Sequence, residues 1–168
     1  MHDESARLIA CIPRLRRYAR ALTGERAGAD DLVQDTMERG WLKLSSWHRG
    51  TDMRAWLFGI MHNLHVDQSR RPVLATVALD EDTSLPSTGP FETDRLELRD
   101  MESALALLPA EQRQLRLLVA LEDLTAEEVA ATLGIPLGTV MSRLSRGRER
   151  LRLSMLGQAV VSPLRVVK

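Results

Sequence analysis

Several features that mark secreted or membrane-spanning proteins are missing from this sequence. Cys11 is the only cysteine in 168 residues, so one chain can form neither an internal disulfide nor a zinc site built from several cysteines. No apolar run approaches the roughly 18 residues of a transmembrane helix. The first ten residues contain Asp3 and Glu4 and lack the apolar core of a signal peptide. We therefore expect a soluble, cytoplasmic protein with no membrane insertion.

The signatures of enzymes are missing as well. The sequence has no glycine-rich phosphate loop, no nucleophile elbow and no metalloprotease motif. His62 and His65 are three residues apart in a helical segment, but the sequence offers no further convergent ligand, and such histidines are most simply packed or solvated. We expect a protein with no catalytic residues, no metal and no other cofactor.

A net charge is also absent, because 23 lysines and arginines balance 23 aspartates and glutamates. The charges are nevertheless unevenly distributed. Arginines gather at residues 14–20 and again at 143–152, whereas residues 80–102 are rich in acidic side chains. Attraction to a phosphate backbone is local and fades within about 10 Å at moderate salt. The balanced total therefore hides two basic ends on either side of an acidic centre.

Apolar residues recur at helical spacing almost throughout, and no segment alternates like a strand. This periodicity predicts an all-α protein of two small helical domains joined by a flexible linker, which prolines and an acidic cluster identify. The expected helices cover residues 4–22, 29–45, 52–71, 94–107, 110–121 and 126–133, with a last one starting near 137. The corresponding parts are a first domain at 1–72, the linker at 73–93, a second domain at 94–154 and a C-terminal tail at 155–168.

Individual residues refine the helix ends and the buried faces. Gly24 suits a helix C-terminus, Asp52 suits an N-cap and Pro72 ends the third helix. Buried stripes are expected at Val33, Met37, Trp41 and Leu44 of the second helix, and at Met53, Trp56, Leu57, Ile60 and Leu64 of the third.

Residues 125–153 have the spacing of a helix-turn-helix. Thr125 and Glu128 occupy the capping-box positions of a short helix. Gly134 then marks a turn before the second helix. Two closely crossed helices need small and apolar contact residues, which the sequence supplies at Ala130, Ile135, Val140 and Leu144.

Three segments carry a family resemblance: ADDLVQDTMERGW, DMRAWLFGIMHNLHVDQSRR and LPAEQRQLRLLVALEDLTAEEVAATLGIPLGTVMSRLSRGRERLR. In this order and spacing they resemble the extracytoplasmic-function (ECF) sigma factors. The first two are similar to sigma region two and the last to sigma region four, so the resemblance covers residues 5–72 and 94–153. It implies a bacterial transcription initiation factor that binds core RNA polymerase, directs it to promoter DNA and helps to open the duplex.

The resemblance assigns polymerase binding to one face of the second helix. In the family an Asp-x-x-Gln-acid motif docks on the coiled coil of the largest polymerase subunit, and Asp31, Gln34 and Asp35 match it, with Glu38 beside them. An acidic edge suits a basic partner. The same spacing would also fit an ordinary solvated helix face.

The resemblance assigns capture of the minus-ten promoter element to the third helix and the loop before it. Asn63, Asp67 and Arg70 share a face of that helix, and Arg71 lies beside them. Amides suit exposed bases and arginines suit phosphates. In the loop at 45–51, Trp47 is placed either to stack on a flipped base or to pack in the domain core. Asp67 is equally suited to an ion pair with a neighbouring arginine.

The second helix of the helix-turn-helix is expected to lie in the major groove of the minus-thirty-five element. We assign base-edge contacts to Ser142, Ser145 and Arg146, and phosphate contacts to Thr139, Arg143 and Arg148. Met141 departs from the family, which usually has a lysine or arginine at this position. The change removes one cationic contact and is expected to alter DNA affinity or sequence preference.

Two other kinds of protein share parts of this pattern. A sigma-like decoy would sequester an anti-sigma factor without using promoters, but its DNA-facing residues should be eroded, and here they are present. A dimeric helix-turn-helix repressor would leave residues 5–72 unexplained. Family members are commonly held inactive by an anti-sigma factor, and the resemblance implies such a partner here.

Overall fold

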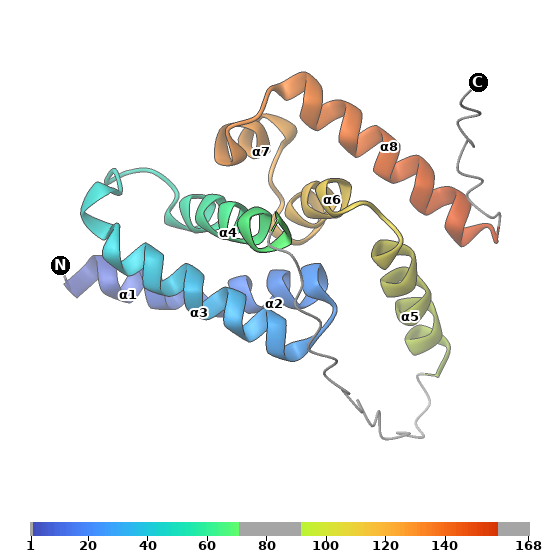
Figure 1. Ribbon diagram of the computed structural model, residues 1–168, viewed down its shortest axis with the longest axis horizontal. Helices are drawn as coiled ribbons and strands as arrows, with labels where there is room; N and C mark the ends of the chain where they lie inside the picture. Colours follow the sequence, from blue (N-terminus) through green and yellow to red (C-terminus); the bar gives the residue numbers. More distant parts are fainter. Residues whose placement is uncertain (1, 71–91, 158–168) are drawn as a thin grey trace.

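The computed structural model describes residues 2–70 and 92–157, and within them every regular element is helical, as the sequence predicts (Figure 1). None of these described helices is long and apolar enough to cross a membrane. Most of the expected linker and tail lies outside the described residues. The first domain consists of α1 (His2–Ala10), α2 (Ile12–Thr23), α3 (Arg26–Leu42), the 3₁₀ helix η1 (Leu44–Ser46) and α4 (Met53–Arg70). The second consists of α5 (Glu92–Ala106), α6 (Ala110–Glu122), α7 (Ala126–Leu133) and α8 (Leu137–Met155).

The single helix predicted over residues 4–22 is wrong, because the chain breaks between α1 and α2 at Cys11. Pro13 has no N–H group for the carbonyl of Ile9, so the regular hydrogen-bond ladder cannot continue there. The Cys11 N–H instead donates to the carbonyl of Leu8 at 3.1 Å, a step of three residues. The predicted end at Gly24 is confirmed: this residue has φ 75° and its N–H donates to the carbonyl of Arg20.

The buried face of α3 differs from the predicted stripe at one residue. Trp41 is 54% exposed, so it was wrongly assigned to the core. The buried face passes instead through Gly40, where a Cβ atom would lie 2.7 Å from Cδ2 of Leu57. The absence of a side chain at residue 40 lets α3 approach α4 closely, and this turns the larger Trp41 outward.

The stripe predicted for α4 is confirmed, since Met53, Leu57 and Leu64 are buried and Trp56 and Ile60 pack against the same core. The N-cap is also as predicted. Asp52 Oδ1 accepts hydrogen bonds from the N–H groups of Arg54 at 2.9 Å and Ala55 at 3.4 Å. Two of the N–H groups that a helix start leaves unpaired are thereby satisfied.

In the second domain the capping box of α7 is complete. The Thr125 hydroxyl accepts from the N–H of Glu128 at 3.2 Å, and the Glu128 carboxylate accepts from the N–H of Thr125 at 2.8 Å. Gly134 ends α7 with φ 67°. The α5 helix packs on the C-terminal half of α8, where Ala104, Leu108 and Leu151 form a small separate cluster.

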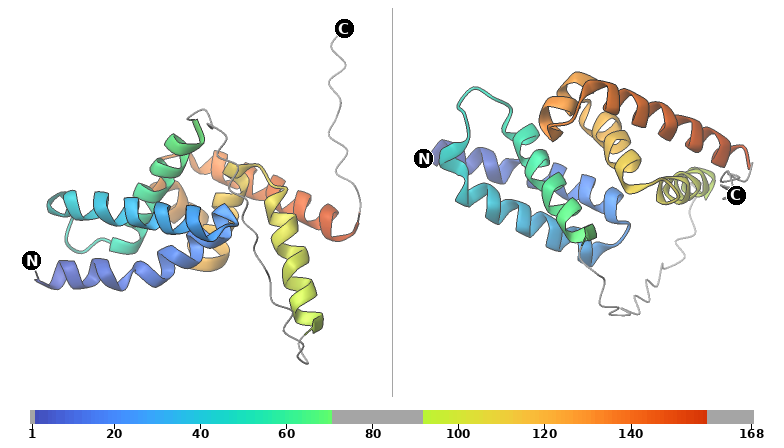
Figure 2. Two further views of the ribbon diagram at one scale, coloured as in Figure 1. Left: turned by 60° about the horizontal axis from the view of Figure 1, so that its bottom comes forward. Right: turned by 45° about the horizontal axis from the view of Figure 1, so that its top comes forward.

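The two domains pack against each other around a shared apolar core, with α2 against α6 and α4 against α7 (Figures 1 and 2). Within the first domain the rings of Tyr18 and Phe58 meet edge to face at 5.0 Å, and across the contact the Tyr18 hydroxyl donates to the carbonyl of Gln114 at 3.4 Å. At the crossing of α4 and α7, a Cβ atom on Gly59 would lie 2.8 Å from the carbonyl oxygen of Thr132. Backbone thus approaches backbone, and the domains fit closely.

Candidate nucleic-acid interface

The packing of α7 on α8 holds one side of α8 toward the core and leaves the other side open. Val140 is fully buried, and Ile135 and Leu144 pack partly buried against the same core, which confirms the anchors predicted for the helix-turn-helix. The left-handed conformation of Gly134 directs the chain from α7 into α8. The outward side of α8 is therefore fixed by apolar contacts on its inward side.

The polar residues predicted to contact duplex DNA differ in their exposure and in their ion pairs. Ser142, Ser145, Arg146 and Arg148 are exposed, and Thr139 is half-buried near the start of the helix. Arg143 is less free than expected. Its side chain is 28% exposed and forms an ion pair with Glu111 of α6 at 3.4 Å. A phosphate contact by Arg143 would have to compete with this carboxylate.

The predicted minus-ten residues of α4 lie at steps of four and three, so they occupy one face of the helix. Asn63, Asp67 and Arg70 are all exposed on that face. No ion pair joins Asp67 to Arg70 in the described part of the chain. Arg71 lies outside the described residues, so its placement is not assigned. The exposed face provides an amide, a carboxylate and a guanidinium in a row.

Trp47 is the residue of the preceding loop whose surroundings bear most on its role. Its side chain is 7% exposed and belongs to the apolar core, which is the packing alternative that the sequence left open. Its indole Nε1 is buried without a hydrogen-bond partner in the described structure. The neighbouring Ser45, Ser46 and His48 are exposed instead. In this conformation the loop offers polar groups, and not an aromatic face, to a base.

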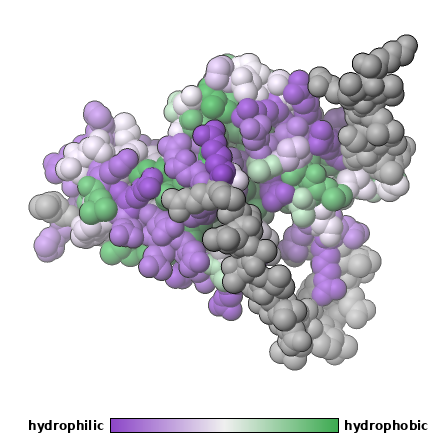
Figure 3. All heavy atoms as spheres, in the orientation of Figure 1, coloured by the Kyte–Doolittle hydropathy of each residue, from purple (hydrophilic) through white to green (hydrophobic). Residues whose placement is uncertain are grey.

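The acidic edge of α3 is present as predicted. Asp31, Gln34 and Glu38 are exposed, and Asp35 is half-buried. The Asp35 carboxylate accepts a hydrogen bond from Nε2 of Gln68 in α4 at 3.3 Å. The surface over α3 is mainly hydrophilic in the view of Figure 3, with smaller apolar areas elsewhere, one of them over α7.

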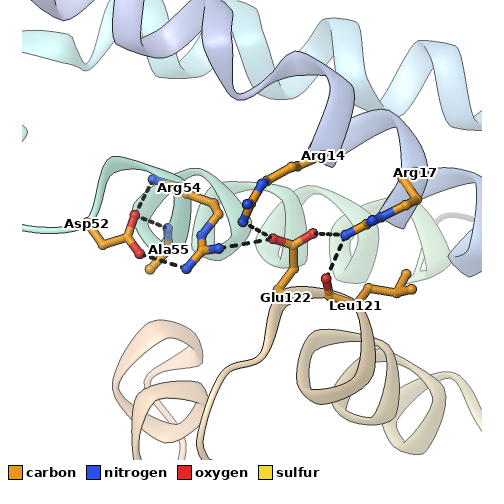
Figure 4. A network of polar contacts seen from close by, with 7 residues as sticks. All are labelled: Arg14, Arg17, Asp52, Arg54, Ala55, Leu121 and Glu122. Carbon is orange, nitrogen blue, oxygen red and sulfur yellow. Dashed lines mark hydrogen bonds and ion pairs between the residues drawn. The ribbon is translucent and has the colours of Figure 1, made fainter.

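A charged cluster that the sequence did not lead us to predict lies at the contact between the domains (Figure 4). The Glu122 side chain, at the end of α6, is fully buried and faces three arginines of the first domain. Its carboxylate lies 3.4 Å from Arg14, 3.4 Å from Arg17 and 3.5 Å from Arg54. Arg17 also donates to the carbonyl of Leu121 at 2.6 Å. A glutamate that directly follows the apolar run LLVAL is the signal that would have pointed to it.

A second interdomain contact is formed by a half-buried arginine. Arg113 of α6 donates to the carbonyl of Leu22, near the end of α2, at 3.1 Å. The same guanidinium donates to the carbonyls of Leu105, Ala106 and Leu108 at 2.9 to 3.0 Å. One side chain thus donates to carbonyls near the end of α2 and around the α5–α6 turn, where helix ends leave carbonyls without intrahelical partners. Arg113 joins the first domain to the α5–α6 turn.

The two histidines of α4 are half-buried and lie near this interface. Burial lowers the pKa of His62, with the Gln114 side chain opposing that shift and Arg143 adding to it. Burial also lowers the pKa of His65, and His62 and Arg113 add to the effect. Nδ1 of His62 is buried without a partner in the described structure. Nowhere in the described residues do three potential ligands gather around a metal position.

Comparisons with known proteins match both domains. The family models described as "Sigma2 domain of PhyR" and "Sigma-70, region 4" match residues 8–62 and 98–151. The ECF RNA polymerase sigma factor EcfG of Rhodopseudomonas palustris (strain TIE-1) is 35% identical over 147 residues, which is 86% of this chain and 80% of the relative.

Solved structures of sigma-type proteins also match the chain. The sigma factor RpoE of Bartonella quintana, in complex with the anti-sigma factor NepR, superposes with a TM-score of 0.74 at 31% identity and covers 93% of this chain and 98% of its own. The anti-anti-sigma factor PhyR of the same organism, in complex with NepR, has a TM-score of 0.60 at 19% identity over 88% of this chain and 48% of its own, which shows a common fold alone.

Two helical domains, the second with a basic helix-turn-helix, define a DNA-binding transcription factor of the sigma type. The chain belongs to the extracytoplasmic-function RNA polymerase sigma factor family.

Proposed function

We propose that the protein binds core RNA polymerase, directs it to specific promoters and assists their opening. The observation that carries this proposal is the 35% identity to an ECF sigma factor across both domains, together with an exposed row of serines and arginines on α8. The activity consists of binding and strand capture. We assign residues 1–72 to polymerase and minus-ten binding, 73–93 to the linker and 94–154 to minus-thirty-five binding, although α8 itself extends to Met155. Such a factor works in the cytoplasm, beside the polymerase.

Polymerase binding is proposed for the acidic edge of α3. Asp31, Gln34, Asp35 and Glu38 lie within two turns, and at about 100° per residue they fall on one side of the helix. The edge is free of ion pairs in the described structure, so its carboxylates are available to a basic partner. The Gln68 contact to Asp35 links this edge to α4.

Minus-ten recognition is proposed for the exposed face of α4 and for the loop before it. Asn63 suits a base edge and Arg70 suits a phosphate, with Asp67 between them. We keep Arg71 in this set on the family resemblance. A stacking role for Trp47 would require its ring to leave the core, so we propose that it holds the loop in place unless promoter binding moves it.

Minus-thirty-five recognition is proposed for α8. Ser142, Ser145 and Arg146 are exposed and suited to base edges, and Arg148 is suited to a phosphate. Thr139 and Arg143 are proposed as further phosphate contacts. Arg143 would first have to break its ion pair with Glu111. The helix presents short hydroxyl side chains together with long arginine side chains, and a helix that binds in the major groove needs both.

We also propose an anti-sigma partner. The Bartonella quintana relative was solved in complex with the anti-sigma factor NepR, and its fold matches this chain over almost its full length. A partner that bound both domains would stabilise the closed packing seen here, and polymerase would compete with it.

A decoy that only captures an anti-sigma factor is the second candidate. The match of residues 8–62 to the sigma2 domain of PhyR favours it, since PhyR of Bartonella quintana is an anti-anti-sigma factor. Against it stand the exposed arginines of α8 and the closer identity to EcfG.

In vitro transcription separates the two candidates. Purified core polymerase, this protein and sheared genomic DNA are combined, and the transcript starts are mapped. A working sigma factor gives discrete starts that share two upstream elements. Folded protein that gives no specific starts would favour the decoy, and it should then still bind an anti-sigma factor in a pull-down.

A further inference from the structure

Two large apolar side chains lie exposed at the start of α8. Leu137 is 41% exposed and Met141 is 55% exposed, and they are four residues apart, so they lie one above the other on the helix. Neither belongs to the apolar core, which uses Val140 and Leu144 from the same turns. The pair is therefore left uncovered in the described structure.

The order of side chains around α8 places this pair beside its polar residues. At about 100° per residue, Met141 lies roughly 40° from Ser145 and roughly 100° from Ser142, with Arg146 further round on the same side. The open side of the helix thus carries an apolar strip, then hydroxyls, then a guanidinium. Each of these positions is exposed except the anchors that face the core.

The charge around the pair points to DNA as its occupant. Arg146 and Arg148 are exposed on the same helix, and neither forms an ion pair in the described residues. Unpaired cations on a helix of the helix-turn-helix complement phosphates. In the major groove the thymine C5-methyl is the apolar group that a helix can contact.

We propose that Met141, supported by Leu137, reads the methyl group of a thymine in the minus-thirty-five element. This inference rests on the proposed function and adds a source of sequence preference to it. Met141 carries a thioether and no charge, so it can offer an apolar contact to a base but no ionic contact to a phosphate. The unbranched methionine side chain adapts well to such a contact.

The test replaces thymine by deoxyuridine, which removes the methyl and keeps every hydrogen-bonding group. Holoenzyme is reconstituted from core polymerase and the full chain, on a promoter identified by transcript mapping. Each thymine of either strand of the minus-thirty-five element is exchanged singly. We expect about a fourfold loss of promoter affinity at one position, because burial of one methyl group has about that effect.

Variants assign the effect to the apolar pair. In Met141→Ala the thymine and deoxyuridine promoters should bind equally, and Leu137→Ala should reduce the difference. Met155→Ala removes an equally exposed methionine from the far end of α8 and should leave the fourfold difference intact.

The inference fails if deoxyuridine has no effect at any position, if the element contains no thymine, or if the difference survives in Met141→Ala. A second outcome also overturns it. If Met141→Ala and Leu137→Ala weaken binding to a co-purified anti-sigma protein but keep the thymine preference, the apolar pair binds a protein partner. If the holoenzyme gives no specific transcripts at all, the proposed function itself fails. Specific transcripts without methyl dependence overturn this inference alone.

Discussion

The carboxylate of Glu122, at the end of α6, lies 3.5 Å from the guanidinium of Arg54 in α4 and so joins the two domains. The Glu122 side chain is fully buried, whereas the Arg54 side chain is 25% exposed. A buried carboxylate is stable only where cations and hydrogen bonds replace its water. The closed arrangement of the domains therefore depends on this charge.

Glu122→Gln should weaken the closed arrangement. The neutral amide leaves Arg14 and Arg17 without the counter-charge of Glu122, and Arg54 with Asp52 alone. We expect the free energy of unfolding to fall by about 2–3 kcal/mol, below the loss for a wholly buried pair because two of the arginines are half-exposed. Urea unfolding measures this change, and small-angle scattering should show a larger radius of gyration. Glu127→Gln, an exposed change on α7, is the control, and equal effects of both variants would contradict the role of Glu122.

Gly59→Ala should disturb the contact between α4 and α7. The added Cβ would lie 2.8 Å from the carbonyl oxygen of Thr132, and backbone cannot move aside as a flexible side chain can. We expect a net loss of about 1–3 kcal/mol in unfolding free energy. Gly138→Ala on α8 meets nothing within 4 Å and should stabilise the protein by up to about 1 kcal/mol. The prediction does not hold if the two variants change the urea midpoint in the same direction.

Stability should fall as the pH drops below about 7. The pKa values of His62 and His65 are lowered from the ordinary 6.5, mainly by burial. Below 6.5 the unfolded chain therefore binds protons that the folded chain does not, and stability decreases until the pH reaches the lowered values. Gln114, Glu111 and Arg143 lie around His62. Of the two charged neighbours, Glu111 favours the protonated imidazole and Arg143 disfavours it.

Urea midpoints between pH 7.5 and 5.5 measure this effect. His62→Gln with His65→Gln should flatten the pH dependence, whereas His48→Gln, at an exposed position of the loop, should not. A slope that is unchanged in the double variant would assign the pH dependence to other groups.

Arg146→Ala should reduce promoter-dependent transcription about 5- to 100-fold, the range for loss of a side chain that reads a base. Affinity for core polymerase should stay unchanged, because Arg146 lies on α8 and the proposed docking edge lies on α3. Run-off transcription and a polymerase pull-down measure the two properties. Arg150→Ala is the matched control on the same helix, and equal loss of both properties in Arg146→Ala would contradict the assignment.

Gln34→Ala combined with Asp35→Ala should have the reverse effect. Removing an amide and a carboxylate from the α3 edge should weaken binding to core polymerase about tenfold, while the isolated protein keeps its fold. Fluorescence titration of labelled protein with core polymerase measures the affinity. Glu127→Ala serves as the comparison, and an affinity equal to that of the wild type would remove the docking assignment.

Local features of the fold were predictable from the sequence because their causes are local. The capping box at Thr125 and Glu128, the αL glycine at residue 24 and the Asp52 cap each depend on residues within four positions. The helix-turn-helix anchors followed from spacing in the same way, and so did the stripe of α4.

Other features depend on contacts between residues of different helices. Trp41 continues the periodic stripe of α3, but Gly40 gives the closer approach to Leu57 and turns the tryptophan outward. Pro13 was present in the sequence, yet the break at Cys11 was not predicted because the apolar period continues across it. The partners of Glu122 lie on two other helices, and periodicity within one helix carries no information about them.

The interdomain contacts also set an order of events in synthesis. Arg14 meets Glu122 across 108 residues of chain, Tyr18 meets Gln114 across 96, and Arg113 meets Leu22 across 91. Because a protein is made from its N-terminus, α1 to α4 are synthesised before any of these partners exists. The nascent first domain thus lacks the partners that Tyr18, Arg14 and Arg17 have in the finished chain, and these groups stay open to solvent until α6 is made.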